Sequence, residues 1–148
     1  MDPKADRDTA RGGRLRDVRG RGRRGPLALP GPLTPSGVPA TQTPAEAFDD
    51  TVVAVVERIR TRFPDEVARV DFGVEDHPLL PEDWDQRVPF ATCVPASADH
   101  PARIVLFRLP LTARARGRAE LGLLVLDTVV EQLAALWGRD PDDIDPPA

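Results

Sequence analysis

Hydrophobic positions recur with a helical period in the segment that follows residue 43. The apolar residues are spaced three or four apart and form one stripe, made of Phe48, Val52, Val55, Val56, Ile59 and Phe63. Thr43 suits the N-cap, Pro44 suits the first helical position, and Glu46 suits the reciprocal half of a capping box. Because Pro64 then ends the pattern, the sequence predicts an amphipathic helix whose stripe faces the core.

A second and more apolar helix is predicted over residues 115–137. Its leucines and valines lie nearly all round the helical projection, which is typical of a central helix rather than a peripheral one. Gly138 suits the residue that terminates it. Residues 142–144 are expected to add one short turn.

Two strands lie between these helices. In residues 68–75, Val70, Phe72 and Val74 alternate with polar residues or glycine, which indicates a half-buried strand. Residues 103–109 (RIVLFRL) predict a second strand, which Pro110 ends, and residues 76–101 predict a long, acidic and proline-rich loop. The order helix, strand, strand, helix predicts an α+β domain with two main helices packed on a small β-sheet.

Composition divides the chain into three parts. Seven of the 17 prolines and seven of the 11 glycines precede residue 45. Residues 1–25 form an Arg/Gly-rich tail that we expect to be disordered, since it buries too little to offset its backbone entropy. Residues 26–42 form a Pro-rich extended arm, whose spaced Leu27, Leu29, Leu33 and Val38 are expected to pack along the domain surface. The folded domain is then residues 43–148.

The charge of the chain is unevenly distributed. Residues 1–25 carry nine Lys or Arg and four Asp or Glu, whereas the remainder carries eleven and twenty, for a net charge of −4. Such a basic tail favours contact with nucleic acid or attraction to the acidic domain. However, no aromatic residue interleaves the arginines, and GC-rich coding explains the same composition. No membrane span and no signal-peptide core is present, so a cytoplasmic protein is expected.

Three stretches together resemble the minimal zincin-like metallopeptidase family. FDDTVVAVVERIRTRFPDEVARVDFGVEDHP resembles the family's opening helix and strand, and RIVLFRLPL resembles its second conspicuous strand. DTVVEQLAALWGRDPDDI resembles its active-site helix, which reads approximately HTVVHEIAHHFGIDD in the family. The resemblance covers about residues 45–145 and implies a small zincin-like domain. The arm RGRRGPLALPGPL resembles the lead-in of a high-GC bacterial branch of the family.

This resemblance also implies that the zinc site of the family is absent. The family uses HExxH, in which two histidines one helical turn apart bind zinc and the glutamate accepts a proton from the zinc-bound water. At these positions the chain has Glu131, Gln132 and Ala135. The third ligand of the family would fall at Pro141, with an aspartate on either side. The resemblance therefore implies no catalytic residue and no zinc cofactor.

One acidic feature remains on the second helix. Glu120, Asp127 and Glu131 lie within about 20° of one line along the helix. This line is explained by a narrow solvent-facing stripe, or by pairing with arginines of the arm or loop. The alternative is a site for a hard cation, which needs several oxygen ligands. Its candidate ligands are Asp127, Glu131, Asp140 and Asp142.

The histidines and the cysteine do not form a recognisable catalytic arrangement. His77 and His100 both precede prolines in the long loop, and we expect them to be solvated rather than metal ligands. Cys93 lies in the same loop. A passive, half-buried thiol is the expected state, and a nucleophile paired with a histidine is the alternative.

These observations lead to three functional hypotheses. The first is a zincin-like protein that has lost the zinc peptidase site, is not an enzyme, and binds an unknown protein or peptide in the former cleft. The second is a metal-dependent hydrolase that uses non-standard ligands. The third is a nucleic-acid-associated protein that acts through residues 1–25.

Overall fold

The structure is a computed structural model that describes residues 41–148 and the backbone of the two-residue strand β1 (Arg16–Asp17). The helices and strands that follow are, in chain order, α1 (Pro44–Arg60), α2 (Pro64–Val67), β2 (Val70–Glu75), β3 (Ala91–Val94), β4 (Ala102–Phe107), α3 (Arg108–Arg114), α4 (Arg118–Trp137) and α5 (Pro141–Ile144). The predicted α+β class is confirmed. The disorder expected for residues 1–25 and the arm at 26–42 fall almost wholly outside the described residues.

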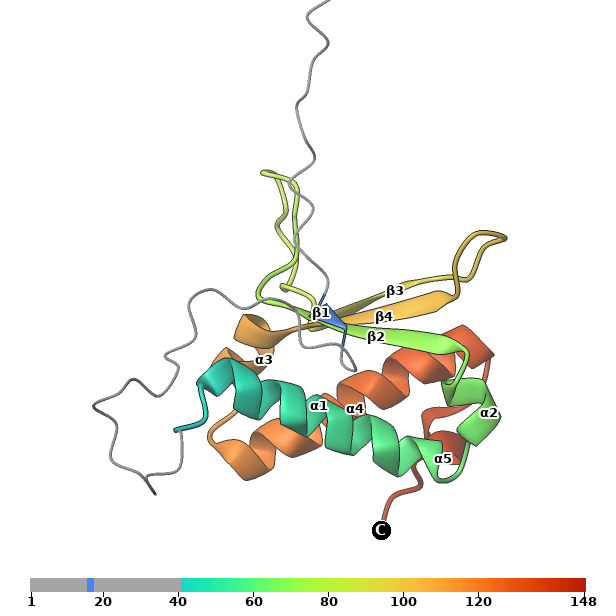
Figure 1. The fold of residues 1–148 in the computed structure, drawn as a ribbon. Helices are drawn as coiled ribbons and strands as arrows, with labels where there is room; N and C mark the ends of the chain where they lie inside the picture. Colours follow the sequence, from blue (N-terminus) through green and yellow to red (C-terminus); the bar gives the residue numbers. More distant parts are fainter. Residues whose placement is uncertain (1–15, 18–40) are drawn as a thin grey trace, which may run out of the picture.

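The sheet has the strand order β1-β2-β4-β3. Strands β2 and β4 are parallel, while β1 and β3 are antiparallel to the strand beside them. Figure 1 shows that the helices lie on one side of the sheet, with α1 and α4 crossing beneath it as the two long elements. The domain therefore has two layers, and the opposite face of the sheet carries no helix.

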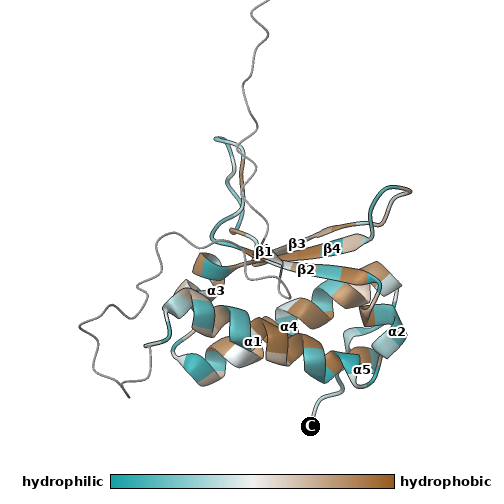
Figure 2. Cartoon of the chain, viewed as in Figure 1, coloured by the Kyte–Doolittle hydropathy of each residue, from teal (hydrophilic) through white to brown (hydrophobic). Residues whose placement is uncertain are grey.

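The core lies between the sheet and the two long helices. Helix α1 contributes the predicted stripe as far as Ile59, and in it Phe48, Val52 and Ile59 are almost fully buried. The helix ends at Arg60, earlier than predicted, and Phe63 lies beyond it as the N-cap of α2. Its start is fixed by the predicted capping box: Glu46 N–H donates to Thr43 Oγ1 (3.2 Å), and Thr43 N–H donates to Glu46 Oε2 (2.9 Å). In Figure 2 the apolar positions of the helices gather toward the sheet.

The predicted long loop contains an element that the sequence analysis did not identify. Residues 91–94 form β3, which pairs with β4 so that Cys93 lies opposite Ile104. The second predicted strand is also shorter than expected, because β4 ends at Phe107 and α3 begins at Arg108. Pro110 lies in the first turn of α3, where a proline is tolerated because its missing N–H has no intrahelical partner there.

Helix α4 differs from the prediction in two respects. It begins at Arg118 rather than near residue 115, because Gly117 breaks the chain with a φ of 125°. It is also not enclosed on all sides, since Leu123 is 63% exposed. Its predicted end is confirmed: Gly138 adopts the left-handed conformation (φ 62°), and the short α5 follows as expected.

None of the helices in the described part of the chain combines the length and hydropathy that crossing a bilayer requires.

Candidate functional site: the cleft between α4 and β3

The exposed side of α4 carries the positions that the sequence analysis singled out. The helix buries Val125, Val129 and Leu133 against the core, which sets the direction of every other side chain. Residues spaced by four on the other side are Asp127, Glu131 and Ala135, and all three are exposed. Gln132, beside Glu131, is half-buried.

A cleft of about 310 Å³ opens beside this exposed side. One wall is α4, which contributes two carboxylates, a leucine and a buried threonine. The other wall is residues 87–90, the segment that leads into β3. The wall residues from α4 are Leu124, Asp127, Thr128 and Glu131. The cleft is thus bounded by one long helix and by the approach to the outermost strand.

The charged groups that line the cleft are more negative than positive. Asp127 and Glu131 supply two carboxylates, and Arg87 supplies one guanidinium from the facing segment. The rest of that segment, Val88, Pro89 and Phe90, is apolar. Thr128 adds no free hydroxyl, because its Oγ1 donates to the carbonyl of Leu124 at 2.7 Å. The lining therefore favours an amphipathic occupant with positive charge.

Strand β3 forms the edge of the sheet next to this cleft. In the strand order β3 has a single neighbour, β4, so its other side has no strand partner among the described residues. An edge of this kind offers backbone N–H and C=O groups to an added strand. Ala91 and Cys93 pack against the core, so β3 is held in place from the helix side.

Two other acids that the sequence analysis singled out, Asp140 and Glu120, hold helix ends. Asp140 caps α5, since its Oδ1 accepts from Asp142 N–H at 3.0 Å. Glu120, at the far end of α4, accepts from Arg116 N–H at 3.0 Å and so supports the start of the helix. Within residues 41–148, no group of three or more His, Cys, Asp or Glu side chains is arranged to hold a metal ion.

The residues that resemble the zinc-binding motif do not fit zinc. Ala135 has no donor atom, Gln132 is an uncharged amide, and only Glu131 offers a carboxylate. Neither histidine replaces the missing ligands, because His77 is exposed in the loop and His100 lies on the other face of the sheet.

The side chain of Cys93 has the half-buried position that the sequence predicts. It is half-buried on the helix side of β3, and this burial raises the pKa of its thiol. His100 Nδ1 lies 3.0 Å from the carbonyl oxygen of Pro101.

Fold and cleft together define a class: a two-layer α+β domain with its site between a long helix and the edge strand of a mixed sheet. Comparison with known families identifies the family. Residues 49–147 match the zincin-like metallopeptidase family, and the chain belongs to it. The match runs from α1 through α5 and so includes both walls of the cleft. No curated protein matches the chain.

Sequence reasoning identified the α4 wall of this cleft but missed the opposite wall. Residues 87–90 and β3 were assigned to a loop, because a strand of four residues is too short to show a clear alternation. A signal was nevertheless present: Pro89 and Pro95 bracket a run that contains Phe90, Thr92 and Val94, which are residues that favour strands.

Proposed function

We propose that this chain is a zincin-like protein without zinc peptidase activity that binds an extended peptide or protein segment in the cleft between α4 and β3. The observation that carries the proposal is the coexistence of two features. The cleft is open and is lined by charged and apolar side chains. However, the helix that forms one of its walls has Glu131, Gln132 and Ala135 at the positions of the family's zinc-binding motif.

The chemistry of those positions supports the loss of hydrolysis. A metal peptidase needs a metal-bound water and a group that accepts its proton. Gln132 is an amide and cannot act as that base, and Ala135 cannot coordinate. No alternative set of three donors is assembled in residues 41–148, which disfavours the hydrolase that uses non-standard ligands.

The lining of the cleft supports an extended, basic and partly apolar occupant. A strand laid against the free edge of β3 gains backbone hydrogen bonds. Its side chains would then meet the apolar wall at residues 88–90 and the carboxylates of Asp127 and Glu131. Arginine or lysine in the occupant would be attracted to these carboxylates, and the acidic domain would accelerate the encounter.

The loss of zinc chemistry is tested by metal analysis and a cleavage assay on the full chain. Purified protein should contain no stoichiometric zinc after dialysis, and it should cleave casein no faster with zinc than with a chelator. About one zinc per chain, or cleavage that a chelator abolishes, would overturn this half of the proposal.

Peptide binding is tested by selection from a phage-displayed library of random peptides. The wild-type chain should enrich basic peptides that the exposed double variant Asp127→Lys/Glu131→Lys does not retain. The matched control is Asp142→Lys/Asp143→Lys, which makes the same charge change on α5, outside the cleft. Equal enrichment by all three proteins, or none by any, would contradict a binding role for the cleft.

Nucleic-acid binding through residues 1–25 stays a prediction, because that tail lies outside the described residues apart from the backbone of β1. A cytoplasmic location and membership of a high-GC bacterial branch also stay predictions.

A further inference from the structure

Another pocket lies at the end of the helix layer where α1 and α4 begin. Figure 1 shows the first turns of these two helices at the same end of the domain as helix α3. The pocket between these elements has a volume of about 260 Å³, and its lining residues fall within residues 44–51 and 112–121. It shares no lining residue with the cleft beside α4, so it is a separate candidate site.

Much of the wall of this pocket is apolar and still accessible. Pro44 is exposed. Ala47, Ala115 and Leu121 are half-buried, so each keeps surface that an occupant can cover. Covering apolar surface favours binding in proportion to its area. Because a cavity of about 150 Å³ is enough for benzene, this larger pocket has room for a small ring or a short alkyl chain.

The charged side chain in the wall is the guanidinium of Arg118. The two threonines that line the pocket use their protons elsewhere, since Thr51 Oγ1 donates to the carbonyl of Ala47 (2.9 Å). Likewise, Thr112 Oγ1 donates to the carbonyl of Arg108 at 2.7 Å. The ion pairs within the described residues are made by other arginines, and Arg118 makes no side-chain hydrogen bond there. Its donors are therefore left for a ligand.

The charge beside this pocket is opposite to that of the rest of the domain. Residues 41–148 carry eleven Arg and twenty Asp or Glu. Arg114, Arg116 and Arg118 lie within five residues of one another, and all three are exposed and outside the ion pairs of the described chain. The acid that follows them, Glu120, accepts from the backbone N–H of Arg116 at 3.0 Å. The described lining contains no carboxylate, so this pocket attracts an anion.

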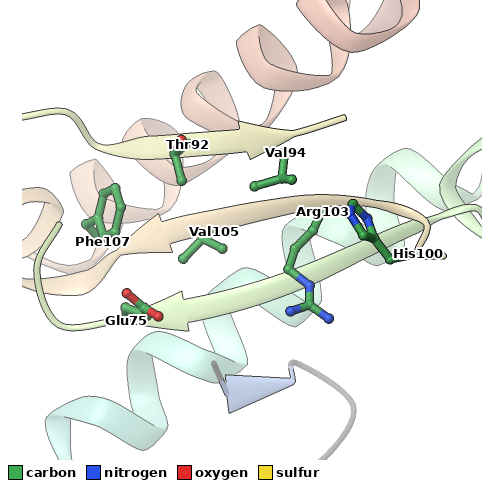
Figure 3. Close-up of a pocket in the computed structure, with 7 residues that line it drawn as sticks. All are labelled: Glu75, Thr92, Val94, His100, Arg103, Val105 and Phe107. Atoms are coloured by element: carbon green, nitrogen blue, oxygen red, sulfur yellow. The ribbon is translucent and has the colours of Figure 1, made fainter. Parts of the chain in front are cut away.

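The pocket on the outer face of the sheet does not offer this combination. Figure 3 shows that Glu75 and Arg103 lie at that pocket. Arg103 Nη2 already lies 3.6 Å from Asp71 Oδ2. Val105 and Phe107 in its wall are each only 4% exposed, so they leave little apolar surface to cover. The cleft beside α4 carries two carboxylates. Of these three sites, the pocket at the start of α1 and α4 is the one that suits an apolar anion.

We propose that this pocket binds a small molecule that carries one carboxylate on an apolar body of about the size of phenylbutyrate. The carboxylate pairs with the guanidinium of Arg118, which can donate two parallel hydrogen bonds to it. Arg114 and Arg116 add longer-range attraction. The apolar body lies against Ala47 and Leu121. This site is distinct from the peptide-binding role proposed for the cleft beside α4.

Titration of the full chain with phenylbutyrate, followed by amide NMR, tests the site. We expect a dissociation constant on the order of 1 mM, which is typical of a ligand of this size. The amide shifts should be confined to residues 44–51 and 112–121. The neutral analogue phenylbutanamide should bind at least about fivefold more weakly, because it lacks the charge. Equal affinity for both ligands, shifts centred on residues 87–90, or no saturable shift would overturn the proposal.

Removing the charge of Arg118 tests its role. Arg118→Gln should weaken the binding of phenylbutyrate about fivefold and leave the binding of the neutral amide unchanged. The matched control is Arg69→Gln, which replaces an exposed arginine outside the pocket and outside the ion pairs of the described chain. Because both arginines are exposed, neither substitution should affect folding. Equal effects of the two substitutions on phenylbutyrate would overturn the assignment of Arg118.

Filling the pocket tests the apolar part of the site. Ala47→Leu places extra methyl groups in the wall and should weaken both ligands at least about fivefold. Ala54→Leu makes the same change at an exposed position of α1 outside the pocket and should weaken neither. The amide spectrum of each variant reports whether it is folded. A folded Ala47→Leu variant that binds both ligands like the wild-type chain would show that they bind elsewhere.

Discussion

At the scale of single residues, the structure separates two leucines of α4 that the sequence treats alike. Leu133 is fully buried between the helices and the sheet, whereas Leu123 is 63% exposed. We expect Leu133→Ala to lower the free energy of unfolding by about 2–5 kcal/mol, because it removes buried methyl groups and leaves a cavity. Leu123→Ala is the matched control and should change it by less than about 0.5 kcal/mol. Chemical denaturation measures both, and equal effects would show that α4 is not packed as described.

Cys93 allows a prediction about pH. Burial raises the pKa of its thiol, so the folded chain holds the neutral form to higher pH than the unfolded chain does. The stabilisation is therefore complete below the pKa of the unfolded thiol, and it is lost as the pH rises through the folded pKa. Alkylation by iodoacetamide at pH 8 should be slower in the native protein than in urea, and Cys93→Ser should flatten the alkaline loss of stability. A native thiol that reacts as fast as the unfolded one would contradict this.

At this scale the sequence predicted much of the core and part of the site. The stripe of α1 was predictable because a helix with one buried face repeats its apolar positions every three or four residues. The exposure of Leu123 was not predictable. On a helix with apolar residues nearly all round, the sequence does not show which of them face solvent. Asp127 and Glu131 were identified, but no sequence pattern indicates that Arg87 faces them across a cleft, since only the fold brings these segments together.

At the scale of elements, the two long helices were predictable, whereas strand β3 and helix α3 were not. One end of each long helix carries a clear signal: a Thr43–Glu46 capping box begins α1, and Gly138 ends α4. Strand β3 and helix α3 lack such marks. Helix α3 was read as the end of a strand, since Pro110 suggested a stop, whereas the proline lies in the first turn of a new helix.

The placement of α4 gives a prediction for that element. Glu131 and Ala135 lie one turn apart on its exposed side, so Glu131→His, Gln132→Glu and Ala135→His would put two imidazoles and a carboxylate next to the cleft. We expect this triple variant to bind zinc more tightly than the wild-type chain or any of the single variants in calorimetric titration. Peptidase activity need not follow, because the groups that orient the ligands are not restored.

Replacing Asp140 or Asp142 in the triple variant tests for a third ligand. Asp140 caps α5 at present, so its recruitment would compete with the cap, and Asp142 is the less constrained of the two. Zinc affinity that does not exceed that of the wild-type chain would argue that residues 131–135 do not occupy the position of the family's zinc motif.

At the scale of the whole molecule, the core of the described part of the chain is formed by residues between Phe48 and Ile144. The C-terminal end of this stretch is tied to the end of α1, because Arg58 donates to Asp145 at 2.8 Å, and Arg62 donates to the carbonyl of Ile144 at 2.7 Å. A domain boundary at residue 43 stays a prediction, since the continuous described part of the chain begins at residue 41.

We accordingly expect a chain of residues 41–148 to fold without the tail and arm. It should unfold in a single cooperative transition, because one core joins both helices to the sheet. The ring of Trp137 packs on Phe63 with centroids 5.6 Å apart, so near-ultraviolet circular dichroism should report a fixed tertiary environment. A broad, non-cooperative melt without a near-ultraviolet signal would show that the preceding residues are needed for the fold itself.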